Sequence, residues 1–185
     1  TVRIANFLRT RNWLKRYIHI SSAEVYGGCD SPATEEAPLK PTTPYAVSKA
    51  AADLYLLTSS RHFGFPITLV RSTNVYGKHQ QLFKIIPRAT IFLKLGRVIE
   101  LHCGGKAIRP FIHIRDVVDG IWKIMCHPNP SILYNFSTDF DACIADVVKV
   151  IANKLDMQFS EVTRSVGQRP AQDSRYWLNS DLAKR

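Results

Sequence analysis

Short β-prone runs alternate with longer helical segments along this chain, and this alternation limits its fold more than any other feature. The clearest strand is Ile67-Thr68-Leu69-Val70, a continuous run typical of a parallel sheet that is covered on both faces. The helix before it begins at Pro44 or Tyr45, with Thr43 as a plausible N-cap, and Gly64 ends it. Strands and helices that alternate at this spacing predict βαβ units, so we expect an α/β fold with a mainly parallel sheet.

The same pattern continues on both sides of this unit. We expect further strands at 17–20, 98–102, 111–114 and 133–136, and further helices at 3–13, 84–95, 117–125 and 142–155. The segment from Gly27 to Pro44 is rich in Gly, Pro, Asp, Glu and Thr, which indicates a loop. The tail at 164–185 is polar, and Arg169-Pro170 predicts a turn within it.

A glycine-rich phosphate-binding turn is missing from the sequence. No GxGxxG or GxxGxxG run follows a strand, and neither Gly27-Gly28 nor Gly104-Gly105 has that pattern. If the fold is Rossmann-like, we therefore expect its first βαβ units to lie upstream of Thr1.

Composition narrows the classes of partner. No apolar run approaches the roughly 20 residues of a membrane span, so we expect no membrane partner. The net charge of +10 suits a ligand that carries phosphates or a nucleic acid, although solvated surface charge explains it equally well. The basic residues are scattered and no nucleic-acid motif is present, so we expect no nucleic-acid partner. The four cysteines have neither CxxC nor metal-ligand spacing, which favours a cytoplasmic protein with reduced thiols and no metal.

Tyr45 and Lys49 lie four residues apart in the predicted helix, so they share one face. A tyrosine has an ordinary pKa near ~10, and a nearby positive charge lowers it. Such a tyrosine can take a proton from a substrate hydroxyl while hydride leaves the same carbon. The spacing is weak evidence by itself, because two residues of these types can share a helix surface without any catalytic role.

Ser22 and Glu24 directly follow the strand predicted at 17–20. Ligands of open α/β sheets bind at the carboxyl ends of the strands. Ser22 can hydrogen-bond the substrate oxygen that Tyr45 deprotonates, and Glu24 can act as a second acid–base group. A solvated loop carboxylate is the alternative interpretation of Glu24.

These segments resemble the extended short-chain dehydrogenases, and the group that acts on nucleotide sugars fits best. The resemblance rests on Ser-Ser-Ala-Glu-Val-Tyr-Gly at 21–27, Pro-Thr-Thr-Pro-Tyr at 41–45, Ser-Lys-Ala at 48–50 and Arg-Ser-Thr-Asn-Val-Tyr-Gly at 71–77. Later segments at 83–87, 104–116 and 169–176 are similar to the dTDP-glucose 4,6-dehydratase group in particular. The likeness therefore covers nearly the whole chain.

The resemblance implies an NAD-dependent homodimeric enzyme that first oxidises C4 of a nucleotide sugar. It implies that Tyr45 is the catalytic base, that Lys49 holds the nicotinamide ribose and tunes Tyr45, and that Ser22 orients the sugar hydroxyl. Glu24 would remove the C5 proton. The side chains that would grip the nucleotide diphosphate or nucleotide are Asn74, Lys84, Arg109 and Arg169.

The sequence departs from the dehydratases beside Glu24. These enzymes have Asp-Glu after the serine or threonine, and this chain has Ala23-Glu24. In that family the Asp protonates the departing C6 hydroxyl, a contribution of roughly 10² to 10⁴-fold for a general acid. Ser-Ala is similar to 4-epimerases, and a small residue before Glu is similar to UDP-glucuronate decarboxylases. Lys78, Phe83 and Pro110 replace the family's usual Pro, Glu and Asp.

We predict a 4,6-dehydratase reaction on a dTDP-glucose-like substrate. A 4-epimerase and a UDP-glucuronate decarboxylase remain alternatives, and a non-catalytic nucleotide-sugar-binding protein is an alternative of another class. The expected fold is a Rossmann-like parallel sheet without its N-terminal strands, followed by a smaller C-terminal substrate-binding lobe. Residues 1–76 would form the first part with the catalytic helix. Residues 77–185 would form mainly the second, with about 110–128 returning to the sheet.

Overall fold

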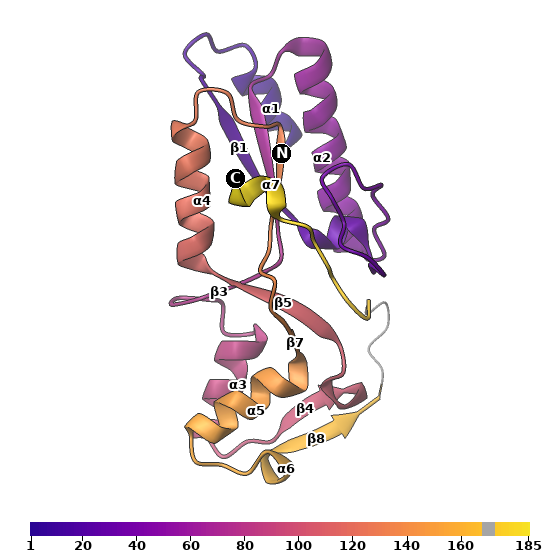
Figure 1. Cartoon of the computed structure of the whole chain (residues 1–185), viewed down its shortest axis with the longest axis vertical. Helices are drawn as coiled ribbons and strands as arrows, with labels where there is room; N and C mark the ends of the chain where they lie inside the picture. Colours follow the sequence, from indigo (N-terminus) through magenta and orange to yellow (C-terminus); the bar gives the residue numbers. More distant parts are fainter. Residues whose placement is uncertain (168–172) are drawn as a thin grey trace.

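The computed structural model describes residues 1–167 and 173–185. The molecule is elongated, with one group of helices around a sheet at one end and a second, smaller group at the other (Figure 1). Within the described ranges, no helix is both long enough and apolar enough to cross a membrane. The predicted turn at Arg169-Pro170 lies outside the described residues.

A three-stranded parallel sheet forms the centre of the larger region, in the order β1-β2-β6. Its strands are β1 (Tyr17–Ser22), β2 (Ile67–Ser72) and β6 (Leu133–Phe136). The central strand β2 is buried along its whole length, as its apolar run predicts. The predicted α/β architecture with a parallel sheet is therefore confirmed.

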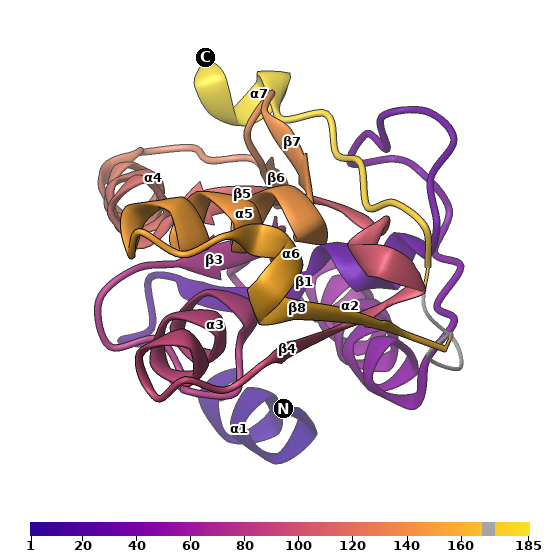
Figure 2. The same cartoon turned by 90° about the horizontal axis from the view of Figure 1, so that it is seen from below.

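Helices cover both faces of this sheet (Figures 1 and 2). On one face, α1 (Val2–Leu8) and α2 (Pro44–Phe63) share a core cluster with Leu69. On the other face, α4 (Ile114–Cys126) shares a core cluster with Val70. Successive residues of β2 point to opposite faces, and this alternation explains why one short strand supports both helical layers.

The ends of α2 follow from local sequence signals. The Thr43 hydroxyl accepts a hydrogen bond from the Ala46 N–H at 3.1 Å, and Pro44 occupies the first turn. Gly64 ends the helix in the left-handed conformation with φ of 63°. The predicted boundaries of this helix are confirmed, and they fix where Tyr45 and Lys49 lie.

The smaller region is built on one two-stranded sheet and two packed helices. The strands β4 (Ile99–His102) and β8 (Thr163–Val166) pair in parallel. The helices α3 (Ile85–Lys94) and α5 (Ile144–Lys154) share an apolar cluster with β4, and Figure 2 shows both helices at this end of the molecule. The short helix α6 (Phe159–Val162) leads into β8.

A third sheet lies between the two regions. It contains β3 (Asn74–Tyr76), β5 (Ile108–His113) and β7 (Asp141–Cys143). The pairing of β3 with β5 is parallel, and that of β5 with β7 is antiparallel. After β5, the chain returns through α4 to β6 in the first sheet, and β7 then leads it to α5 (Figure 1). The division at residue 76 stays a prediction.

The structure corrects several predicted elements. The helix expected from Ala142 begins at Ile144, because Ala142 pairs with Arg109 across β5 and β7. The Cys143 thiol caps this helix by accepting from the Asp146 N–H at 3.4 Å. The helix expected at 3–13 ends at Leu8. The strands β3 and β8 were not predicted from the sequence, since three or four residues give too little periodicity.

Candidate active site

A cavity of about 660 Å³ lies at the carboxyl ends of β1 and β2. Its walls come from the ends of these strands, the first turn of α2, β3 and the loop that follows it, the start of α3, and β5. Ligands of open α/β sheets bind at this edge, and the volume falls within the roughly 300–1,000 Å³ of small-molecule sites. The cavity is therefore the candidate active site.

Ser22 ends β1 and begins the short 3-10 helix η1 (Ala23–Tyr26). Its hydroxyl oxygen accepts from the Glu24 N–H at 3.2 Å, and a hydroxyl that accepts one hydrogen bond can still donate another. Ser22, Ala23 and Glu24 all line the cavity. The turn thus presents a hydroxyl and a half-buried carboxylate to the same space.

Tyr45 lies in the first turn of α2, where its side chain lines the cavity and is 53% exposed. Lys49 follows one turn later. Its ammonium group donates to the Ile20 carbonyl at 2.7 Å, and the residue is not part of the cavity wall. This bond joins α2 to the end of β1, so it fixes the helix that carries Tyr45 against the strand that carries Ser22.

A buried polar network lies behind this wall and connects its parts. The Arg71 guanidinium on β2 donates to the Asp53 carboxylate of α2 at 2.9 Å and to the Tyr26 hydroxyl of η1 at 2.7 Å. Tyr26 in turn donates to the Asn135 side chain at 2.9 Å. Burial is the main cause that raises the pKa of Tyr26, which keeps this phenol protonated as a donor. One arginine thereby holds both the helix with Tyr45 and the turn with Glu24.

The part of the cavity wall that comes from β3, the residues before α3, and β5 carries the cationic and amide side chains. Asn74 comes from β3, and Lys84 precedes α3 with its ammonium 5.5 Å from the Phe83 ring centroid. Arg109 comes from β5 and is 8% exposed. Burial is the largest effect on the pKa of Arg109 and lowers it, while the charge of Glu24 acts in the opposite direction. The arrangement provides positive charge and amide donors for an anionic ligand.

Arg109 also holds the C-terminal segment, residues 173–180, against the cavity. Its guanidinium donates to the carbonyls of Ile108 at 2.7 Å, Ser174 at 3.1 Å and Asp173 at 2.6 Å. It also lies 4.2 Å from the ring centroid of Tyr176. The resemblance implied that this arginine grips the nucleotide diphosphate or nucleotide, and nothing in the sequence indicated its bonds to backbone carbonyls.

The C-terminal segment runs along the loop before α2 (Figure 1). The N–H groups of Cys29 and Ala33 donate to the carbonyls of Arg175 and Trp177 at 3.2 and 2.8 Å. The Thr42 hydroxyl donates to the Asp173 carboxylate at 2.7 Å. These bonds bring a residue from the end of the chain, Tyr176, into the cavity wall.

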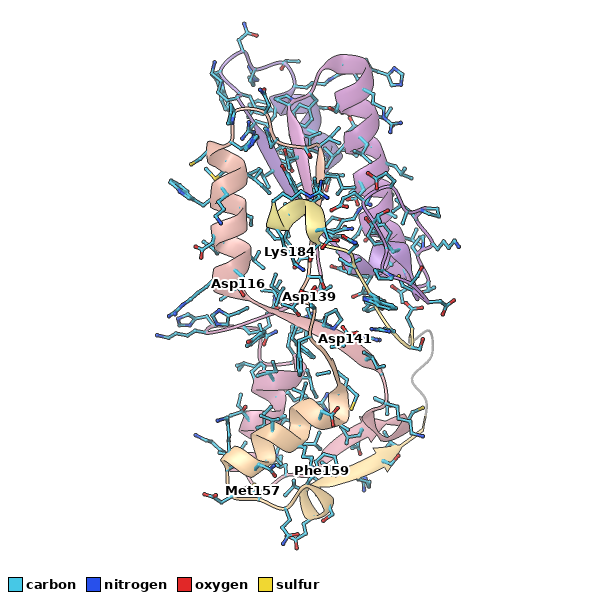
Figure 3. The ribbon with its side chains drawn as sticks, viewed as in Figure 1. Asp116, Asp139, Asp141, Met157, Phe159 and Lys184 are labelled. Atoms are coloured by element: carbon cyan, nitrogen blue, oxygen red, sulfur yellow. The ribbon has the colours of Figure 1, made fainter. Side chains whose placement is uncertain are left out.

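Ion pairs fasten the same segment and the helix after it to β7 and to the turn before β7, and Figure 3 labels the acidic partners. Arg175 pairs with Asp141 of β7. Lys184 pairs with Asp139 at 2.7 Å and lies in the terminal helix α7 (Asp181–Lys184). Both pairs join parts of the chain that are more than thirty residues apart in sequence.

Tyr176 is a site residue that sequence reasoning missed. It is 8% exposed, and burial raises the pKa of its phenol, with the charges of Glu24 and Asp173 as further causes that raise it. The tyrosine stands in a segment whose likeness to the dehydratases was noted. Its position in a polar tail without periodicity gave no sign that it enters the cavity.

The structure brings most of the predicted site residues together. Ser22, Glu24, Tyr45, Asn74, Lys84 and Arg109 line one cavity. Lys49 lies one turn from Tyr45 and is bonded to β1. Arg169 lies outside the described residues. The roles assigned to these side chains stay predictions.

Comparison with known proteins places this geometry in context. Residues 1–135 match the model of the NAD dependent epimerase/dehydratase family. The human dTDP-D-glucose 4,6-dehydratase is 33% identical over 174 residues, which are 91% of this chain and 50% of that protein. The chain spans about half the length of the curated relatives it matches.

Solved structures show the same fold. The dTDP-glucose 4,6-dehydratase DesIV from Streptomyces venezuelae, with NAD and TYD bound, superposes with a TM-score of 0.91 at 28% identity. The match covers 98% of this chain and 58% of that one. The UDP-glucuronic acid 4-epimerase from Bacillus cereus gives a TM-score of 0.92 over 98% of this chain and 58% of that one. Its identity is 20%, so it shows a shared fold alone. The Rossmann-like fold predicted from the sequence is thereby confirmed.

Proposed function

Because this chain belongs to the NAD dependent epimerase/dehydratase family, we propose that the natural protein oxidises C4 of a nucleotide sugar as its first chemical step. The observation that carries this proposal is the convergence of Ser22, Glu24 and Tyr45 on one cavity at the carboxyl ends of β1 and β2. These side chains come from two separate segments, and the fold brings a hydroxyl, a carboxylate and a phenol to one place.

The residues around Tyr45 fit the nicotinamide end of NAD. The Ser21 hydroxyl is buried beside the cavity and has no hydrogen-bond partner among the residues that the structure describes. An unpaired buried hydroxyl is costly, and a polar ligand would satisfy it. The Lys49 ammonium at the end of β1 supplies a donor for a ribose hydroxyl. Bound NAD would accept hydride from the sugar and return it later in the reaction.

Tyr45 would take the proton from the C4 hydroxyl, and Ser22 would donate a hydrogen bond to that oxygen. The resulting 4-keto group makes the C5 hydrogen acidic. Glu24, a half-buried carboxylate in the same cavity, can remove this hydrogen as a proton.

The 4,6-dehydratase reaction on a dTDP-glucose-like substrate is our first proposal for the complete conversion. The dehydratases among the curated relatives, at 33% identity, support it. We assign the nucleotide diphosphate to Asn74, Lys84 and Arg109, which line the cavity, and to Arg169 by sequence. The formal net charge of +10 agrees with a ligand that carries phosphates.

A 4-epimerase is the second candidate, and Ala23 is the observation that favours it. Ala23 is 3% exposed and lines the cavity, yet its methyl group has no proton to give a leaving hydroxyl. Epimerisation needs no such donor, since hydride returns to the opposite face of C4. A decarboxylase of a uronic acid sugar would likewise not need an acid at residue 23.

A homodimer and a cytoplasmic location also belong to the proposal. Exposed apolar side chains on α1 and α2, such as Phe7 and Leu54, support an interface through these helices. The four cysteines are free thiols, which is consistent with a reducing compartment.

Mass spectrometry of the products tests these possibilities together. The natural full-length protein would be incubated with NAD and a panel of dTDP- and UDP-sugars. A product lighter by one water supports the dehydratase, an unchanged mass with altered retention supports the epimerase, and loss of carbon dioxide supports the decarboxylase. Binding without any conversion would contradict the catalytic proposal and leave a nucleotide-sugar-binding protein.

A further inference from the structure

We propose that Tyr176 donates the proton to the C6 hydroxyl as it leaves, the step for which Ala23 has no acid. This inference rests on the proposed dehydratase function. It assigns a catalytic role to a side chain that the sequence pattern left without one. It also explains how a cavity with alanine at residue 23 can still expel water.

The position of Tyr176 is the first support. The side chain lines the same cavity as Ala23 and Glu24, and it enters from the C-terminal segment. Two hydrogen bonds from the Arg109 guanidinium, to the carbonyls of Ser174 and Asp173, hold the start of that segment, and the ring lies 4.2 Å from the same guanidinium. Tyr176 is 8% exposed, so its phenol is held within the wall of the cavity.

The charges around the phenol are the second support. Burial, followed by the negative charges of Glu24 and Asp173, raises the pKa of Tyr176, so the phenol is protonated at neutral pH. Glu24 loses its negative charge when it takes the C5 proton. One cause of the raised pKa then disappears, and the phenol becomes a stronger acid as the hydroxyl begins to leave. The Arg109 charge also stabilises the phenolate that remains.

The proposed step balances in atoms and charge. The C5–H bond breaks toward the Glu24 carboxylate, and its electron pair forms the C5–C6 double bond. The C6–O bond breaks, and the proton of the Tyr176 hydroxyl joins the leaving group to form water. Hydride returns to C6, and Glu24 returns its proton to C5. Solvent then returns a proton to Tyr176, and Tyr45 releases to solvent the proton that it took from the C4 hydroxyl. No proton is gained or lost over the cycle.

A packing role must be separated from this catalytic role. Tyr176 belongs to a core cluster with Tyr26, Ala33 and Leu178, so a drastic substitution would disturb the loop before α2. Tyr176→Phe keeps the ring, the cluster and the contact with Arg109, and it removes the hydroxyl that carries the acidic proton together with its hydrogen bond to Asp173. Tyr55→Phe is the matched control. Tyr55 lies on the part of α2 away from the cavity, and the substitution removes a hydroxyl that donates to the Asn6 side chain of α1.

The experiment follows one turnover of the natural full-length protein loaded with NAD and mixed with dTDP-glucose. Absorbance of reduced nicotinamide reports C4 oxidation, and mass spectrometry reports loss of water. In Tyr176→Phe we expect C4 oxidation to continue and water loss to fall by about 10² to 10⁴-fold, the usual effect of a general acid. Reduced nicotinamide should accumulate as a result, while Tyr55→Phe should retain both steps.

Two further experiments test whether Tyr176 donates a proton to the leaving group. Adding Ala23→Asp to Tyr176→Phe places a carboxylic acid beside Glu24 and should restore water loss. A dTDP-glucose analogue with fluoride in place of the C6 hydroxyl has a leaving group that does not need a proton. Tyr176→Phe should therefore eliminate fluoride at nearly the rate of the unmodified protein.

The outcomes separate this inference from the dehydratase proposal. Water loss at an unchanged rate in Tyr176→Phe would overturn the inference and leave the dehydratase function standing. Loss of both steps, without rescue by Ala23→Asp, would show a structural role and would also overturn it. If the unmodified protein oxidises C4 but releases no water, the dehydratase proposal fails, and the inference fails with it.

Discussion

At the scale of single residues, Arg71 connects the helix that carries Tyr45 to the turn that carries Glu24. Its guanidinium is 2% exposed, and the Asp53 carboxylate with which it pairs is fully buried. The same guanidinium donates to Tyr26 and lies 4.8 Å from the centre of that ring. Removing one partner of such a pair destabilises the fold mainly because the other partner stays behind as an uncompensated buried charge.

We therefore expect Arg71→Ala to lower the free energy of unfolding by about 3–5 kcal/mol, because Asp53 loses its ionic partner inside the core. Urea denaturation measures this change. Arg164→Ala is the control, since its pair with Glu100 is exposed at 67% and 47% and should cost only about 0–1 kcal/mol. Equal losses in the two variants would contradict the structural role assigned to Arg71.

His19 makes stability depend on pH. Burial is the largest cause that lowers the pKa of His19, the charge of Lys49 lowers it further, and Asp53 opposes both. The Nε2 atom is buried and lacks a hydrogen-bond partner in the described part of the chain. A lowered folded-state pKa means that the unfolded chain binds the proton more readily. The contribution of His19 to the free energy of unfolding is therefore fully present above the unfolded pKa of about 6.5, and it is lost as the pH decreases through the folded pKa.

His19→Gln should remove this contribution. We expect urea midpoints of the unmodified chain to fall more between neutral and mildly acidic pH than those of the variant. Both proteins lose stability from other groups, so the difference between their slopes is the quantity of interest. Identical slopes would show that His19 does not titrate differently in the folded state.

At the scale of elements, the sequence predicts those helices and strands whose boundaries depend on neighbouring residues. The boundaries of α2 follow from Thr43, Pro44 and Gly64, and the buried strand β2 follows from its apolar run. The strands β3, β7 and β8 depend on partners far along the chain, and each has only three or four residues. A run this short has too little periodicity to predict a strand from the sequence. The same reason applies to the site. Ser22, Glu24 and Tyr45 stand in local patterns, while Tyr176 reaches the cavity only through long-range bonds.

The loop between η1 and α2 contains a close backbone approach at Gly27. Its φ of +72° favours glycine, and an added Cβ would lie 2.2 Å from the Lys40 carbonyl oxygen. Gly64 has a similar φ of +63° with nothing within 4 Å of such a Cβ. We expect Gly64→Ala to cost about 1–2 kcal/mol of stability, the usual cost of left-handed backbone. Gly27→Ala should cost more, and thermal denaturation that ranked them in the opposite order would refute this account of the loop.

At the scale of the whole molecule, the C-terminal segment joins the sheet between the two regions to the larger region. From Asp173 it follows the loop before α2, and α7, which comes after it, contacts β6 (Figure 1). On the way it forms part of the cavity wall through Tyr176. The candidate active site is therefore complete only when both regions and the end of the chain are assembled.

Removing the Arg109 guanidinium should loosen the attachment of the C-terminal segment. Arg109→Met loses the bonds to the carbonyls of Ile108, Ser174 and Asp173. Since the Ala33 N–H donates to the Trp177 carbonyl, we expect its hydrogen exchange to become severalfold faster. Amides in β2 provide an internal control and should not change. Unaltered exchange at Ala33 would contradict the holding role of Arg109.

The central claim is that this cavity oxidises a nucleotide sugar through Tyr45. Its most direct test is the absorbance of reduced nicotinamide after one rapid mixing of dTDP-glucose with the NAD-loaded natural protein. The account predicts a rise for the unmodified protein and its loss by at least about 10²-fold in Tyr45→Phe, which keeps the ring in place but removes the proton-accepting oxygen. An equal rise in the two proteins would contradict the claim.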